Sequence, residues 1–71
     1  MSWMKSVYSS MVSEVGYDDD TGEMLVRWAN SGKTSAYAGV SEDVAFEAAQ
    51  AASVGQYINS EIKGQYGHRY K

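Results

Sequence analysis

The sequence predicts an α+β fold in which a three-stranded antiparallel meander is followed by two short helices packed on one face (β-β-β-α-α). Turn-forming Asp, Asn and Gly residues divide the first 40 residues into short segments rich in Val and Tyr, a pattern typical of strands joined by tight turns. After Ser41 the apolar residues change to helical spacing. Because the chain has 71 residues, it is predicted to form a single domain over 1–71.

The first strand is expected over residues 7–18, with Val12, Val15 and Tyr17 directed toward the core. Strict alternation fails between Val12 and Val15, which are three positions apart. An extra residue in one strand of a pair produces this shift. We therefore predict a β-bulge near Ser13.

The second strand is expected over 24–29 and the third over 34–40. The acidic turn 18–22 and the turn 30–32 are both short, so neighbouring strands should run antiparallel. Alternation along the second strand assigns one set of side chains to the core: Met24, Val26 and Trp28.

Ser41 is a suitable helix N-cap, and acidic Glu42 and Asp43 follow in the first turn, where the helix dipole favours them. Ser53 and Gly55 mark a break before a second helical segment. Four larger apolar side chains of that segment are predicted to lie near one face: Tyr57, Ile58, Ile62 and Tyr66.

Composition excludes several kinds of site. The chain has no Cys, so it can form neither a disulfide nor a Cys-ligated zinc site. The single histidine, His68, is interpreted as a mobile surface residue near the chain end. We expect no catalytic residues, no cofactor and no metal. No apolar run approaches the roughly 20 residues of a membrane span, so we expect a cytoplasmic protein without membrane contact.

Two local motifs are weak. Gly32-Lys33-Thr34 resembles the end of a phosphate-binding loop, but Arg27 occupies the position where that motif needs its first Gly. The run 18–22 resembles the start of a calcium loop, but Ala29 stands where the loop needs Glu. We interpret both segments as hairpin turns.

Charge is unevenly distributed along a chain whose net charge is −3. Residues 14–23 carry five acidic side chains and no Lys. Residues 63–71 carry Lys63, Arg69 and Lys71 with Tyr66 and Tyr70 between them. Cations interleaved with aromatic rings can bind nucleic acid, although three cations give a small electrostatic footprint. Residues 67–71 are predicted to be a basic tail.

The order of these residues resembles the KTSC domain family over about residues 5–66. The family pattern begins with a Ser pair and V-G-Y-D, matched by Ser9-Ser10 and by Val15-Gly16-Tyr17-Asp18. Its most specific motif spans the break before the second helical segment and the segment itself, and it is matched by Ala51, Ser53, Gly55, Tyr57, Asn59, Ile62 and Lys63. The chain departs from the pattern at Ser35, where the family has Tyr, and at Ser41, where it has Pro.

The motif residues Ser9, Ser10, Gly16, Tyr17, Ser53 and Gly55 are assigned structural roles. Ser9 and Ser10 are expected to bond to nearby backbone. At Gly16 and Gly55 we expect a positive φ or a close packing contact, at one or both positions.

The resemblance implies no catalytic residues. The family is attached to some lysyl-tRNA synthetases and also occurs as free-standing bacterial and phage proteins, which implies an accessory or binding role. The first hypothesis is a non-enzymatic interaction module that engages a host or phage protein, with homo-oligomerisation left open. The alternative is an RNA- or DNA-binding accessory module. The candidate binding surface consists of Tyr57, Asn59, Lys63, Tyr66, Arg69 and Lys71.

Overall fold

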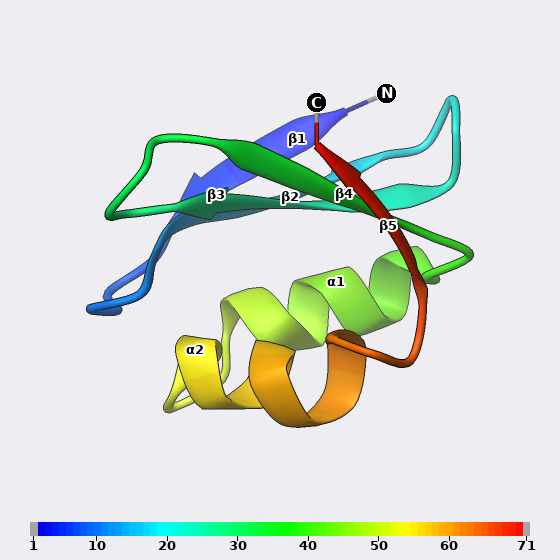
Figure 1. The fold of residues 1–71 in the computed structure, drawn as a ribbon. Helices are drawn as coiled ribbons and strands as arrows, with labels where there is room; N and C mark the ends of the chain where they lie inside the picture. The colour runs from blue at the N-terminus through cyan, green and yellow to red at the C-terminus, as the bar shows by residue number, and fades with distance from the viewer. Residues whose placement is uncertain (1, 71) are drawn as a thin grey trace.

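In the computed structural model, residues 2–70 are described, and they form a five-stranded sheet with a helical layer beneath it (Figure 1). The elements in chain order are β1 (Trp3–Ser6), β2 (Val12–Asp18), β3 (Glu23–Trp28), β4 (Thr34–Ala38), α1 (Glu42–Ala49), α2 (Val54–Tyr57), the π-helical turn η1 (Ile58–Ile62) and β5 (Gly67–Tyr70). All neighbouring strands pair antiparallel, in the order β1-β2-β3-β4-β5.

The prediction of a three-stranded meander is wrong, because β1 and β5 extend it on both sides. The α+β class and the helices on one face are as predicted (Figure 1). The two added strands have only four residues each, and every side chain of β5 is exposed. An edge strand that pairs with its neighbour through backbone hydrogen bonds needs no alternation of apolar and polar side chains. Neither β1 nor β5 therefore shows the alternation by which strands are recognised in a sequence.

The prediction that residues 67–71 form a basic tail is also wrong for residues 67–70, which form β5. β5 pairs with β4 through four positions, including Tyr37↔His68 and Ser35↔Tyr70. The chain reaches this strand through Gly64, whose φ of 84° is a left-handed conformation that favours glycine. Residue 71 lies outside the described residues.

The central strands follow the sequence pattern, but two are shorter than predicted: β2 begins at Val12 rather than at residue 7, and β4 ends at Ala38 rather than at residue 40. Val12, Val15 and Tyr17 are all buried. The register of β2 on β3 shifts between Val12 and Glu14, which confirms the bulge at Ser13. Ser9 bonds locally as expected, because its Oγ accepts from the backbone N–H groups of residues 11 and 12 at 3.2 and 3.4 Å.

The helices begin as predicted but end earlier. Ser41 caps α1, with its Oγ accepting from the backbone N–H of Val44 at 3.4 Å. α2 continues directly into η1, where the N–H of Lys63 bonds the carbonyl of Ile58 at 2.7 Å. Tyr66 therefore lies beyond the helix, in the connection to β5, and its predicted place on the helical face is wrong.

One core lies between the sheet and the helices. Its largest fully buried members come from both layers: Met24, Ile58, Ile62, Val12, Val15, Val26 and Val40. Within residues 2–70, none of the helices is long and apolar enough to cross a membrane.

Candidate functional site

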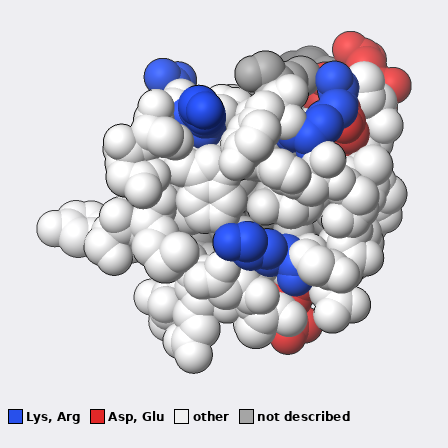
Figure 2. Space-filling view, viewed as in Figure 1, with Lys and Arg blue, Asp and Glu red and all other residues white. Residues whose placement is uncertain are grey.

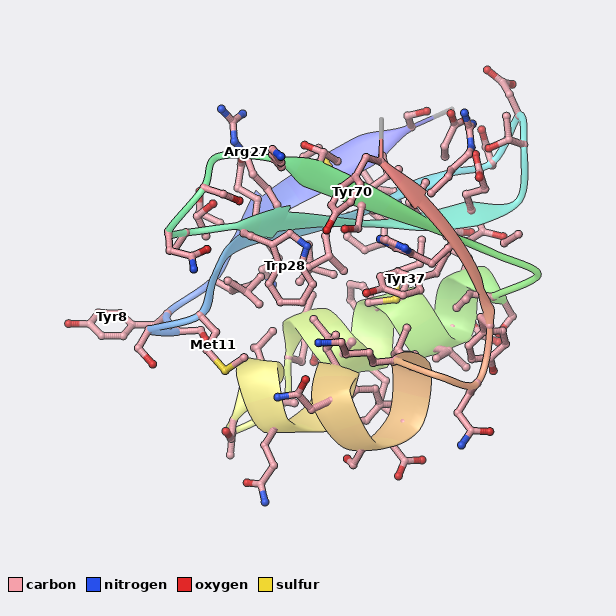
Figure 3. All side chains as sticks on the ribbon, in the orientation of Figure 1. Tyr8, Met11, Arg27, Trp28, Tyr37 and Tyr70 are labelled. Carbon is pink, nitrogen blue, oxygen red and sulfur yellow. The ribbon has the colours of Figure 1, made fainter. Side chains whose placement is uncertain are left out.

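A pocket of about 600 Å³ opens where β5 crosses in front of the helical layer. Figure 3 shows Trp28 and Tyr37 between the sheet and the helices, with Tyr70 above them in front of β4. Five of its lining residues carry rings and come from β3, β4, the η1–β5 connection and β5: Trp28, Tyr37, Tyr66, His68 and Tyr70. We call this feature the aromatic pocket.

Strand pairing explains why these side chains meet. Alternate residues of a strand face the same side, so Ser35 and Tyr37 of β4 share one face, as do His68 and Tyr70 of β5. The register places Ser35 opposite Tyr70 and Tyr37 opposite His68. Two pairs of residues more than 30 positions apart thereby form one wall of the pocket.

Ser35 connects the rings at the base of this wall. Its side chain is fully buried. Trp28 Nε1–H donates to Ser35 Oγ at 2.7 Å, and His68 Nε2 lies 2.9 Å from the same oxygen. Both contacts hold a ring in one orientation, so the pocket wall is fixed before any ligand arrives.

Ring contacts continue from His68 in both directions. Its centroid lies 5.1 Å from that of Tyr37 and 4.9 Å from that of Tyr70, the second contact being edge-to-face. Burial and, secondarily, the nearby Tyr70 raise the pKa of Tyr37, while its hydrogen bond with Ser35 works against them. Tyr37 therefore keeps its hydroxyl proton at neutral pH.

The charge around the pocket is positive although the whole chain is negative. The described lining residues include Lys63 but no Asp or Glu. Lys33 Nζ lies 5.5 Å from the centroid of the Tyr70 ring, at cation–π range. The pocket therefore favours a ligand that carries negative charge.

Arg69 does not contribute to this charge. It faces the side of β5 opposite to His68 and Tyr70, and its Nε and Nη2 donate to Glu23 Oε2 and Oε1 at 2.9 and 2.8 Å. These bonds, and then the charge of Glu23, raise the pKa of Arg69. The bidentate pair connects β5 to β3 across the intervening β4.

The six residues of the predicted binding surface do not all lie at one site. Lys63 and Tyr66 line the aromatic pocket. Asn59 is exposed beside it, with its Nδ2 3.9 Å from Met11 Sδ. Tyr57 packs against the core instead, and burial followed by the charges of Glu47 and Glu61 raises its pKa. Arg69 is held by Glu23, and Lys71 lies outside the described residues.

Most of the pocket lies outside the binding surface predicted from the sequence: Trp28, Ser35, Tyr37, His68 and Tyr70. His68 is exposed, as predicted, but it belongs to β5 and bonds Ser35, so its predicted place in a loose chain end is wrong. The i, i+2 spacing of Ser35 and Tyr37, repeated in His68 and Tyr70, was the available signal. It indicates two strands that each present a polar group and a ring on one face.

The Ser35–His68 distance equals that of a nucleophile and its general base. The Ser35 side chain is nevertheless fully buried, and its oxygen already accepts the Trp28 indole N–H. This hydroxyl therefore holds rings in place rather than facing a substrate.

The acidic turn lies elsewhere on the molecule. Asp18, Asp19 and Asp20 place their carboxylate oxygens within 4.8 Å of one another. Asp18 Oδ1 accepts the backbone N–H of Asp20 at 3.0 Å. This is the hairpin turn that was predicted.

The fold and the pocket together define a class of small α+β domains, in which a five-stranded meander rests on short helices and its last strand closes an aromatic hollow. The family model for the KTSC domain matches residues 8–66. The chain therefore belongs to the KTSC domain family, as its motifs indicated.

A crystal structure of a KTSC domain protein from Yersinia pestis is similar to this chain, with a TM-score of 0.88 and 28% sequence identity. The match covers 100% of this chain and 99% of that one. No curated protein sequence matches the chain.

Proposed function

We propose that this KTSC domain is a non-enzymatic interaction module that binds another protein through the aromatic pocket. The observation that carries the proposal is the preformed pocket bordered by exposed apolar side chains. Met11 and Tyr70, both in the lining, are 41% and 63% exposed, and Tyr8 in the same loop as Met11 is fully exposed. Figure 3 shows Tyr8 projecting away from the body of the molecule.

Protein-binding energy concentrates in aromatic side chains that fill or line pockets. The aromatic pocket offers such a centre, and Tyr8 and Met11 extend its apolar surface. The similar protein from Yersinia pestis supports a bacterial setting, with a host or phage protein as partner. The absence of Cys agrees with the reducing cytoplasm.

The test is quantitative capture of partners from a bacterial lysate with the wild-type chain and two variants. Tyr70→Ser removes an exposed ring from the pocket, whereas Phe46→Ser removes a ring of similar exposure from α1. We expect one stoichiometric partner, retained by Phe46→Ser and reduced about tenfold or more by Tyr70→Ser. Equal capture by both variants, or no partner from any lysate, contradicts the proposal.

A second candidate, binding of RNA or DNA, is favoured by the combination of rings with Lys63 and Lys33. Two observations weaken it. Arg69 is occupied by Glu23, and Figure 2 shows the basic side chains of this face as separate groups with uncharged surface between them. If nucleic acid is the ligand, tRNA should shift in a gel at low salt and be released steeply as salt rises.

A further inference from the structure

We infer that the segment recognised by the aromatic pocket carries an aromatic side chain next to a carboxylate. This inference rests on the proposed protein-binding function and names the chemistry of the partner. It is argued from the polar groups, the charge and the surroundings of the pocket.

Three polar groups of the pocket wall already have partners within the chain. Trp28 Nε1–H donates to Ser35 Oγ, and His68 Nε2 lies at hydrogen-bond distance from the same oxygen. The surfaces left for a ligand there are ring faces and edges. Such surfaces gain most from a flat apolar group that stacks or packs edge-to-face.

Two lysines border the pocket. Lys63 belongs to the lining and is exposed, while Lys33 reaches over Tyr70 from the β3–β4 turn. Glu61, the acidic residue of η1, borders a separate hollow that shares Tyr66 with the aromatic pocket. A carboxylate next to the bound ring would therefore meet cations without a competing acid in the lining.

The surface beside the pocket suits a protein segment better than a nucleotide. The surface that continues from the pocket is the loop 7–11, which contains no charged residue and exposes Tyr8 and Met11. A polypeptide can cover this apolar surface with further side chains. A phosphate backbone gains nothing from it, because phosphate binding depends on cations.

The chain supplies its own reporter for the test. It has two tryptophans: the Trp28 indole lies in the pocket, whereas the Trp3 indole donates to Glu42 at 2.9 Å beside α1. An NMR titration of the 15N-labelled chain therefore has one indole N–H signal at the site and one remote control signal.

The probes are acetyl-Ala-Glu-Phe-Glu-Ala-amide, the same peptide with Lys for Glu, the same peptide with Ala for Phe, and uridine monophosphate. We expect only the first to move the Trp28 signal at millimolar concentration, with the Trp3 signal unchanged. Lys63→Gln should weaken this binding about two- to fivefold. Lys5→Gln, which alters a lysine beside Phe46, should not.

Equal shifts with the Lys peptide, equal shifts with the Ala peptide, movement of both indole signals, or no shift at all would each overturn the inference. Tighter binding of uridine monophosphate than of the acidic peptide would assign the pocket to nucleotides and also overturn it. If the lysate partner depends on Tyr70 while the acidic peptide leaves Trp28 unmoved, the binding function stands and only the segment chemistry fails.

Discussion

Gly16 lies in β2, where the edge strand β1 pairs beside it in the register Met4↔Gly16. Its φ is not positive, so of the two roles expected for it the close packing contact is confirmed. A Cβ at this position would lie inside van der Waals contact with Met4 Sδ and the Trp3 carbonyl oxygen. The sulfur can swing away, but the carbonyl belongs to the backbone of a paired strand.

Gly16→Ala should therefore displace β1. Overpacking of this kind costs about 1–3 kcal/mol, and 1 kcal/mol corresponds to about 4–8 °C in a domain of this size. We expect the melting temperature to fall by about 4–24 °C. The Trp3 indole N–H signal should also shift, since β1 carries the hydrogen bond from Trp3 to Glu42.

Gly55→Ala is the matched control. Its Cβ would lie 3.1 Å from Met11 Sδ and 3.4 Å from Ser9 Oγ. The thioether is the end of a flexible, exposed side chain, so it can move at small cost. Thermal melts followed by circular dichroism compare the two variants. A Gly16→Ala chain that melts within about 1 °C of the wild type, or that melts above Gly55→Ala, refutes this reasoning.

Three further predictions concern the site. Burial raises the pKa of Tyr37 in the folded chain above its ordinary value of 10.0, so the Tyr37 hydroxyl of the unfolded chain loses its proton first as pH rises. The free energy of unfolding should therefore fall above pH 10, and it should fall less in Tyr37→Phe. Chemical denaturation of both chains at several pH values checks this. Ser35→Ala removes the acceptor of Trp28 and should lower the free energy of unfolding by about 1–3 kcal/mol; an unchanged urea midpoint contradicts this. Arg69→Gln should lower the melting temperature while Lys63→Gln leaves it unchanged, and equal melts would show that the ion pair is not structural.

The central strands and the start of α1 were predictable because local chemistry specifies them. Turn residues bound β2, β3 and β4, a broken alternation reveals the bulge at Ser13, and Ser41 supplies the cap. These signals lie within a few residues of the structure that they determine.

β1, β5 and the pocket were not predictable in the same way. β5 is held by backbone pairing with β4 and by the Arg69–Glu23 pair, whose members are 46 positions apart. Its exposed side chains carry no core pattern. The pocket depends on this long-range pairing, because the register Ser35↔Tyr70 and Tyr37↔His68 assembles one of its walls. His68 and Tyr70, which were predicted to lie in a tail, therefore belong to a paired strand that lines the aromatic pocket.

Site-specific photo-crosslinking tests the central claim most directly. A photoreactive phenylalanine analogue is placed at Tyr70 in the pocket or at Phe46 on α1, two exposed aromatic positions on different elements. The chain is then irradiated in the lysate. The account predicts a discrete crosslinked protein from position 70 and none from position 46. Crosslinks of equal yield from both positions, or from position 46 alone, would show that the partner does not bind at the aromatic pocket.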